Sequence, residues 1–331
     1  MIIVRVPLRI SFVGGGSDLP AFYERAVGQV ISTAIDKYIF IAINKKFDGR
    51  FRVSYSVTEN VNKPEEIENT RVRAALLHFV PSQGLEIVSV SDVPGRGTGL
   101  GSSSSFTVGL IHGLACFLGK KEHRDKRTLA ETACHLEQKI LGEPLGKQDQ
   151  YAAAYGGFNL LKFYPEKVTV QPIKIPKNKL DEFRAHFLVF YAGGPRDAKY
   201  NSGLLTKNLN SDEKKFLAQK RLAEWVTPFK NKLLQGDFKS LGEIIHEGWL
   251  LKRSTSPVVS NEMIDELYKI GRRNGAWGGK LLGAGGGGFI FFLAPPKNQK
   301  KLRRVFSKLR ELPVGFDYRG STVIFNRYER T

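Results

Sequence analysis

Short runs in which apolar and polar residues alternate fill the first third of the chain. A period of two places the apolar side chains on one face of a strand, so these runs predict mainly antiparallel β-strands. The predicted strands are residues 2–6, 9–13, 28–35, 38–45, 51–55 and 85–92. We therefore expect a sheet to form from the first part of the chain.

Helical spacing of apolar positions begins at residues 105–119, where Gly119 gives a C-terminal stop. Thr128 and Glu131 have the spacing of a capping box, which predicts a second helix that ends near Gly142. Further helices are predicted at residues 150–155, 213–234, 238–252, 261–274 and 300–312, and further strands at residues 158–164, 185–194, 277–283, 289–296 and 321–325.

The Pro- and Lys-rich stretch at residues 165–179 is the predicted domain junction. It divides the chain into a domain of residues 1–178 and a domain of residues 179–331. The mixed order of elements predicts an α+β fold, a sandwich with helices on one face of a sheet.

Composition narrows the class of protein. The chain has 331 residues, of which 41% are hydrophobic, and no run of about 18 uncharged apolar residues, so a membrane span is not expected. The first residues contain Arg5 and Arg9 and no small-residue cleavage site, which predicts a cytoplasmic location. Cys116 and Cys134 lie in predicted apolar helices and are expected to be reduced core residues.

A formal net charge of +19 suits partners that carry negative charge. Nucleic acid is one such partner and an anionic small substrate is another. The densest basic groups fall in predicted helices, where solvated faces explain them. RNA binding would also need exposed aromatic residues between the basic ones, and the sequence shows no such platform.

Residues 95–105 read GRGTGLGSSSS and lie between a predicted strand and a predicted helix. Glycines allow the backbone to approach a ligand closely, and the first amides of a helix favour an anion. No Lys-Ser or Lys-Thr pair follows the glycines, so this is not a Walker A loop. A serine N-cap explains part of the stretch, and a phosphate cradle explains all of it.

Residues 7–19 form a predicted strand that ends in Gly14, Gly15 and Gly16, followed by Ser17 and Asp18. Asp18 could project into a cleft and accept hydrogen bonds from sugar hydroxyls. Alternatively, Ser17 or Asp18 could cap a short helix at residues 19–26.

Two carboxylates stand in positions that call for a partner. Glu137 shares an otherwise apolar helix face, where a lysine or a divalent cation would compensate its charge. Asp149 opens the alanine-rich helix, with Lys147 two residues earlier as a cation that could hold it ionised. A carboxylate in this state beside a substrate hydroxyl is a candidate general base.

The stretch of residues 280–290 is a glycine turn between two apolar strands. A hairpin needs only one or two glycines, so five indicate tight backbone packing. The glycine loop at residues 95–105 is one candidate for what packs there.

Taken together, these three glycine stretches resemble the signature motifs of the GHMP kinase family of small-molecule kinases, and they come in the family's order. The resemblance implies an ATP-dependent phosphotransferase that uses ATP and Mg²⁺. It also implies a two-domain GHMP kinase fold, with a ribosomal S5 domain 2-like N-terminal domain, a ferredoxin-like C-terminal domain and the active site between them.

The resemblance implies roles for particular residues. The ATP phosphates would be bound by Gly97, Gly99, Leu100, Gly101, Ser102, Ser103 and Ser104. The metal ion would be bound by Ser103 and Glu137. The catalytic residues would be Asp149 and Arg9, and Lys147, two residues before Asp149, is a further candidate cation for that group. The substrate would be contacted by Gly15, Gly16, Ser17, Asp18, Gly285 and Gly286.

Galactokinases have Gly-Glu-His-Thr-Asp where this chain has Gly14-Gly-Gly-Ser-Asp18, so galactose is not the expected substrate. The chain is most similar to the branch that phosphorylates D-glycero-D-manno-heptose 7-phosphate, with fucokinases next. A substrate that already carries phosphate needs a second anion site. Its candidates are Arg196, Lys252, Arg253 and Lys280, for each of which plain surface charge is the alternative.

The expected activity is thus phosphorylation of the anomeric hydroxyl of a phosphorylated heptose, for synthesis of nucleotide-activated heptose and surface glycans. Another sugar 1-kinase activity is the nearest alternative. An RNA-binding protein on an S5-like fold and an inactive kinase-like regulator are alternatives of other classes, but neither explains the intact acidic pair. The expected partners are a phosphosugar and ATP, without nucleic acid or membrane, and a homodimer is compatible with the sequence.

Overall fold

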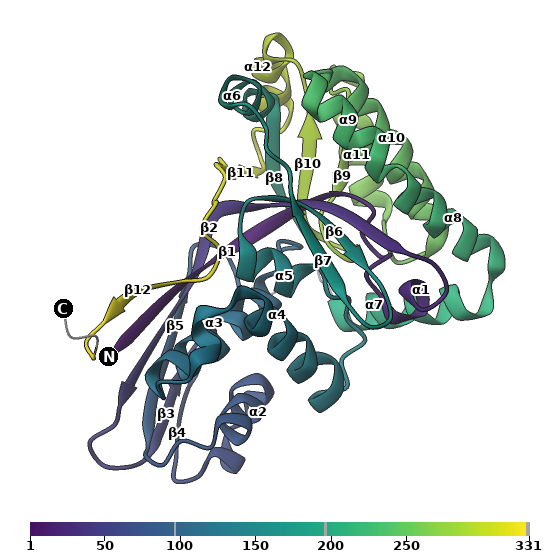
Figure 1. The fold of residues 1–331 in the computed structure, drawn as a ribbon. Helices are drawn as coiled ribbons and strands as arrows, with labels where there is room; N and C mark the ends of the chain where they lie inside the picture. Colours follow the sequence, from purple (N-terminus) through teal and green to yellow (C-terminus); the bar gives the residue numbers. More distant parts are fainter. Residues whose placement is uncertain (96, 195–196, 329–331) are drawn as a thin grey trace.

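The computed structural model describes residues 1–331 except residues 96, 195–196 and 329–331. Among these residues the fold has a large sheet and a smaller sheet with helices around both (Figure 1). The predicted α+β class is confirmed.

The large sheet is built on two long strands, β1 (Ile2–Val13) and β2 (Gly28–Lys45). Its path runs β12-β1-β2-β5-β3-β4, while β6 also pairs with β2, and β7 pairs with β6. The other strands are β3 (Phe51–Ser54), β4 (Thr58–Val61), β5 (Leu85–Ser91), β6 (Phe158–Phe163), β7 (Val168–Pro172) and β12 (Thr322–Asn326).

Strand β2 pairs with β6 through residues 28–33 and with β5 through residues 39–45. The prediction of two separate strands at residues 28–35 and 38–45 is therefore wrong, because the polar residues between them continue the pairing with β1 instead of forming a turn. The result is an 18-residue strand that supports both branches of the sheet.

Helices α2 (Thr70–Phe79), α3 (Ser102–Phe117), α4 (Lys126–His135) and α5 (Gln148–Tyr155) lie on one face of this sheet (Figure 1). Helix α3 packs closely on β1 and β2, since a Cβ added at Gly109 would lie 2.7 Å from Val6. The predicted capping box is wrong: Asp125 caps α4, accepting hydrogen bonds from the amides of Arg127 and Thr128.

The small sheet has the order β11-β8-β10-β9. Its strands are β8 (Phe187–Gly193), β9 (Gly278–Leu281), β10 (Gly288–Leu293) and β11 (Arg310–Glu311). Its helices are α6 (Lys177–Ala185), α7 (Ala198–Ser211), α8 (Glu213–Glu224), α9 (Val226–Gln235), α10 (Phe238–Thr255), α11 (Glu262–Arg273) and α12 (Pro296–Val305). Trp225 interrupts the helix predicted at residues 213–234, which is two helices instead.

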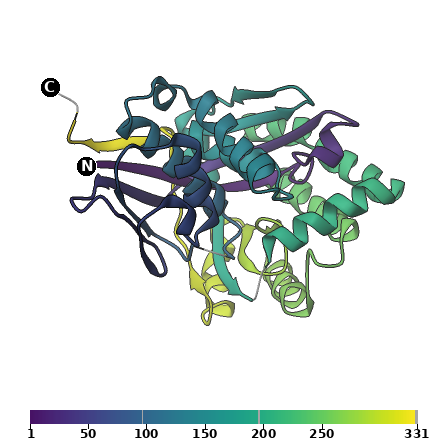
Figure 2. The same cartoon turned by 90° about the horizontal axis from the view of Figure 1, so that it is seen from below.

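The last described strand returns to the large sheet. Strand β12 pairs antiparallel with β1 and lies beside it in both views (Figure 1 and Figure 2). Residues 322–326 thus belong to the first sheet, although they follow the second one in the sequence. The domain boundary after residue 178 stays a prediction, and it concerns only the chain before β12.

Aromatic side chains fill the region between the two sheets. Phe12 at the end of β1 contacts the rings of Phe158, Phe183, Phe187, Phe229 and Phe291. Both sheets therefore contribute to one continuous core. None of the helices in the described residues is long and apolar enough to span a membrane. Cys134 is buried and Cys116 is half-buried, and neither forms a disulfide bond within the described residues.

Candidate active site

The loop at residues 97–101 leads directly into α3, with Gly101 as the N-cap at φ 78°. The first hydrogen bond of the helix runs from the Ser105 amide to the Gly101 carbonyl, 2.9 Å away. The amides of Ser102, Ser103 and Ser104 precede that bond, and with the helix dipole they favour an anion. The geometry is that of the predicted phosphate cradle.

The four serines of this segment do not have equal roles. Three hydroxyls are buried in bonds within the protein: Ser102 with Thr98 (2.9 Å), Ser104 with Glu137 (2.9 Å) and Ser105 with the Pro7 carbonyl (3.0 Å). Ser103 is exposed at the helix start. Of the four, it is the one whose hydroxyl is placed to meet a ligand.

Asp149 lies beside this helix start, in the first turn of α5. Arg9 of β1 donates to both of its oxygens, from Nε at 2.7 Å and from Nη2 at 2.9 Å. The same guanidinium donates to the Gly99 carbonyl at 2.6 Å, and a Cβ at Gly101 would lie 3.3 Å from the Asp149 carboxylate carbon. The structure thus brings the predicted base, its cation and the phosphate loop together.

Lys147 does not join this group. Its ammonium lies over the Tyr23 ring, 4.5 Å from the centroid, and its amide donates to the Asp18 carbonyl. The prediction that Lys147 holds the Asp149 carboxylate is corrected: Arg9 does so, because its buried bidentate geometry suits a carboxylate.

Glu137 is fully buried in a single π-helical turn, Leu136–Ile140, at the end of α4. Its carboxylate accepts from Ser104, Thr107, Gln150 and Arg71. The compensating partner is an arginine of α2, rather than the lysine or divalent cation that the sequence left open. Arg71 also pairs with the buried Glu143, which Lys199 of α7 contacts at 2.6 Å.

This network bears on the predicted metal ligands. A carboxylate offers about four acceptor positions, and donors occupy those of Glu137 while Arg71 neutralises its charge. Glu137 in this arrangement does not fit a metal ligand, although the exposed Ser103 is accessible. No cluster of three or more His, Cys, Asp or Glu side chains with metal-binding geometry occurs among the described residues.

Asp18 is buried and organises the turn of residues 14–18. One oxygen accepts from the Gly16 amide at 2.9 Å and from Gln148 Nε2 at 3.1 Å, and the other accepts from the Gln148 amide at 3.1 Å. Burial, followed by the nearby Asp149, raises the pKa of Asp18. The predicted sugar contact of Asp18 remains a prediction; its observed bonds position the residues around it.

Neither Ser17 nor Asp18 caps the following helix, so that interpretation is wrong. The short helix α1 (Pro20–Tyr23) has Leu19 as its N-cap without a side-chain bond. The Ser17 hydroxyl is buried in two bonds to the backbone of Gln29, each 2.9 Å long.

The glycine turn between β9 and β10 packs on the phosphate loop, as predicted. The Phe289 amide donates to the Thr98 carbonyl at 3.0 Å, and a Cβ at Gly288 would lie 2.5 Å from that oxygen. In this turn the carbonyls of Gly285 and Gly286 accept from Asn201 and Asn261, and the predicted substrate contact of these glycines stays a prediction.

The candidates for a second anion site divide into three groups. Lys280 of β9 is buried and donates to the carbonyls of Ser11 (3.1 Å) and Phe12 (3.2 Å), and Lys252 donates to the Gly283 carbonyl at 2.6 Å. Arg253 is paired with Asp265 instead. Arg196 lies outside the described residues.

The comparisons with known proteins bear on the whole chain. Residues 69–157 match the GHMP kinases N terminal domain, and residues 229–313 match the GHMP kinases C terminal domain. The chain is also 31% identical over 321 residues to a D-glycero-alpha-D-manno-heptose 7-phosphate kinase of Campylobacter jejuni, covering 92% of each protein. This chain belongs to the GHMP kinases. The enzyme class predicted from the sequence, a sugar kinase, is confirmed.

Other proteins similar to this GHMP kinase are also named as kinases of sugars. A bifunctional fucokinase/GDP-fucose pyrophosphorylase of Arabidopsis thaliana is 28% identical, over 93% of this chain and 31% of that protein. A solved putative sugar kinase of Campylobacter jejuni has a TM-score of 0.75 at 29% identity, with 97% of each chain covered. A heptose 1-phosphate kinase structure from Bacteroides thetaiotaomicron has a TM-score of 0.82 at 22% identity, covering 99% and 100%, and shows the fold alone.

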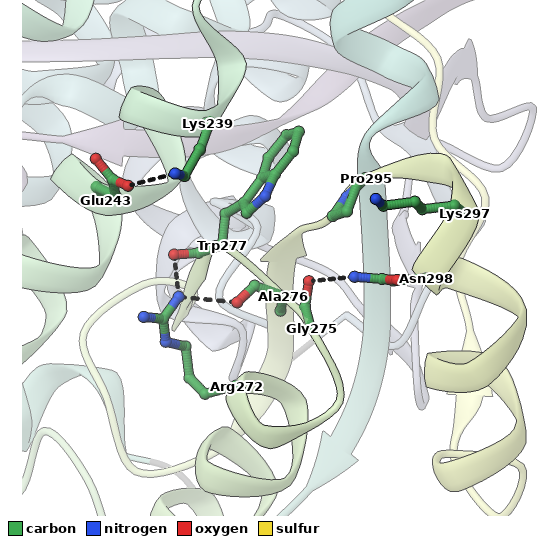
Figure 3. Close-up of a pocket in the computed structure, with 9 residues that line it drawn as sticks. All are labelled: Lys239, Glu243, Arg272, Gly275, Ala276, Trp277, Pro295, Lys297 and Asn298. Atoms are coloured by element: carbon green, nitrogen blue, oxygen red, sulfur yellow. Dashed lines mark hydrogen bonds and ion pairs between the residues drawn. The ribbon is translucent and has the colours of Figure 1, made fainter.

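A pocket of about 480 Å³ lies at the far end of α10 and β9 from the GHMP kinase motifs (Figure 3). Trp277, Arg272 and Lys239 are among its lining residues. Arg272 donates to the carbonyls of Ala276 and Trp277, and Lys239 faces Glu243.

Sequence reasoning missed Arg71, Thr98 and Ser11. Arg71 joins the site through a hydrogen bond to Glu137, which is distant in the sequence. Thr98 joins it through a hydrogen bond with Ser102 at the start of α3. Ser11 lies in a predicted strand, two residues after Arg9. This spacing places both side chains on the same strand face, and it was the signal available in the sequence.

Proposed function

We propose that this GHMP kinase transfers the γ-phosphoryl group of ATP to the anomeric hydroxyl of D-glycero-D-manno-heptose 7-phosphate. The product would be the 1,7-bisphosphate, a precursor of nucleotide-activated heptose for surface glycans. The observation that carries the chemistry is the Arg9–Asp149 pair in contact with the start of α3. The similarity to the Campylobacter jejuni enzyme supports the choice of sugar.

In this proposal the amides of α3 and the loop at residues 97–101 hold the phosphates of ATP. The anomeric oxygen attacks the γ-phosphorus, the bond from that phosphorus to ADP breaks, and Asp149 accepts the hydroxyl proton. Arg9 fixes both oxygens of Asp149 and adds positive charge where negative charge develops. GHMP kinases use ATP typically with Mg²⁺, and no step here is assigned to Glu137.

The 7-phosphate is proposed to bind near Lys280 and Lys252. Burial, Lys252 and Arg9 together lower the pKa of Lys280 well below the usual lysine value. A phosphate beside Lys280 would favour its protonated form, because a nearby anion stabilises an ammonium. Lys280 is tied to the backbone of β1 beside the turn of residues 14–18, so the phosphate would approach from the side of the small sheet.

The test is a coupled ADP-release assay with heptose 7-phosphate, L-fucose, galactose and mevalonate as acceptors. We expect kcat/KM for heptose 7-phosphate to exceed each of the others by at least about tenfold, because the charged site recognises its phosphate. Higher turnover of fucose would select the fucokinase alternative, which the Arabidopsis relative favours.

The base role is tested in the same assay with Asp149→Asn. This variant keeps the side-chain shape and removes the proton acceptor, so kcat should fall about 10²- to 10⁴-fold while ATP binding persists. Asp181→Asn, an exposed aspartate of α6 that pairs with Arg184, is the matched control. Near-normal turnover by Asp149→Asn would remove Asp149 from the base role.

A further inference from the structure

The side chain of Gln148 is held in one orientation by its neighbours. Its Nε2 donates to Asp18 Oδ1 at 3.1 Å, and its own amide donates to Asp18 Oδ2 at 3.1 Å. Because Asp18 Oδ1 also accepts from the Gly16 amide, it acts as an acceptor, and the side-chain nitrogen of Gln148 faces it. The Oε1 atom of Gln148 therefore points away from Asp18.

That oxygen is buried and has no hydrogen-bond partner among the described residues. The hydroxyl of Ser11, on β1, is in the same condition, and only 5% of this residue is exposed. Both atoms lie near Gly15, since a Cβ there would lie 3.4 Å from Ser11 Oγ, 3.6 Å from Gln148 Nε2 and 3.9 Å from Gln148 Oε1. Buried polar atoms are nearly always paired, so two together indicate a polar ligand.

The position of these atoms fits a substrate rather than a structural partner. Gln148 directly precedes Asp149, and Ser11 lies two residues after Arg9 on the same strand face. The carbonyl of Ser11 accepts from Lys280, the proposed phosphate ligand. A sugar placed between Asp149 and Lys280 would thus pass Gln148 and Ser11.

We infer that Gln148 and Ser11 form a subsite that reads one sugar hydroxyl other than the reacting one. Gln148 Oε1 accepts a hydrogen bond from that hydroxyl, and the Ser11 hydroxyl donates a hydrogen bond to its oxygen. Gly15 places no side chain between these two groups. Asp18 acts here as a positioning residue, because it fixes the Gln148 amide without facing the sugar.

The inference rests on the proposed function, and its experiment separates the two. Binding of heptose 7-phosphate and of its 2-, 3- and 4-deoxy analogues is measured by titration calorimetry with a non-hydrolysable ATP analogue present. If the wild-type chain does not bind heptose 7-phosphate, the proposed function fails and the subsite as stated fails with it. If the wild-type chain binds heptose 7-phosphate, the analogues test the subsite alone.

The wild-type chain should bind one deoxy analogue about ten- to hundredfold more weakly than the parent sugar, since the buried acceptor is left unpaired. Gln148→Met keeps the length of the side chain and removes the acceptor. This variant should bind the parent sugar more weakly than the wild type by a similar factor. Its Kd for that deoxy analogue should differ from the wild-type Kd by less than about threefold. Gln171→Met, an exposed glutamine of β7, is the matched control and should bind as the wild type does.

A merely structural role of Gln148 would weaken the parent and all three analogues by the same factor, and that result would overturn the inference. The inference would also be overturned if Gln148→Met bound heptose 7-phosphate as tightly as the wild-type chain does. Ser11→Ala provides the same comparison should Gln148→Met fail to fold, and the same selective loss for one analogue is expected from it.

Discussion

Lys280 brings an amine into the interior of the protein, where its nitrogen donates to two carbonyls and lies near two cations, Lys252 and Arg9. Burial, Lys252 and Arg9 lower its pKa, so the folded chain resists protonating this group. Between the lowered pKa and the usual lysine value, the unfolded chain binds more protons than the folded one. The free energy of unfolding must therefore rise with pH across that window.

We predict that the wild-type chain gains stability relative to Lys280→Met as the pH is raised from about 7 to about 9.5, by at most about 1.4 kcal/mol per pH unit. Urea denaturation at both pH values measures this difference. Lys45→Met, which removes an exposed lysine of β2, should show a difference that is nearly the same at both. A pH-independent difference for Lys280→Met would mean that this lysine titrates as it does in the unfolded chain.

At this scale the sequence reveals some site residues and hides others. Arg9, Gly101 and Asp149 lie in short motifs whose chemistry is local, and the structure brings them together as the motifs predict. Arg71 is 66 residues from Glu137, and nothing in its surroundings marks it. The orientation of Gln148 also depends on a contact with Asp18, 130 residues away, so no local pattern could predict it.

The turn between β9 and β10 shows how one element completes another. Gly288 has φ 104°, and an added Cβ would overlap the carbonyls of Thr98 and Gly97 in the phosphate loop. Gly288→Ala should lower the free energy of unfolding by about 1–3 kcal/mol. Because the overlap displaces the loop, KM for ATP should rise as well, which steady-state kinetics will measure.

Gly49→Ala is the control for backbone strain alone. Gly49 also has a positive φ, 74°, yet nothing lies within 4 Å of the position of its Cβ. Its substitution should destabilise the protein modestly and leave KM for ATP unchanged. If Gly288→Ala also leaves KM unchanged, the turn does not support the shape of the phosphate loop.

Elements with regular periodicity were predicted from the sequence, and those shaped by tertiary contacts were not. Strand β1 and helix α3 follow their apolar patterns, although β1 is one strand instead of the two predicted at residues 2–6 and 9–13. The π-helical turn at residues 136–140 and helix α2 were not predicted. The π-helical turn lies where Glu137 meets donors from α2, α3 and α5, so contacts from other elements accompany this departure from α-helical geometry.

The active site depends on the packing of the two sheets as a whole. The large sheet supplies Arg9, and helices on its face supply the α3 amides and Asp149. The small sheet supplies Lys280 and the glycine turn that contacts Thr98. These groups meet only when the sheets are docked, so the folding of the two halves and the formation of the site should be coupled.

Phe12 is the residue at which this coupling can be measured. It contacts five aromatic rings, of which Phe187 and Phe291 belong to the small sheet and Phe158 to the large one. Phe12→Ala should lower the free energy of unfolding by about 3–5 kcal/mol, as expected for a buried ring. Calorimetry should still show a single transition, shifted to lower temperature, because the core is continuous.

Phe47→Ala removes a fully exposed ring of the same kind and should leave the transition in place. Two transitions in the Phe12→Ala scan, with only the earlier one shifted, would show that the halves are stable separately. A single shifted transition would mean that the Arg9–Asp149 pair and the Lys280 site are lost together on heating. Loss of ATP binding and of phosphosugar binding should then follow the same temperature curve.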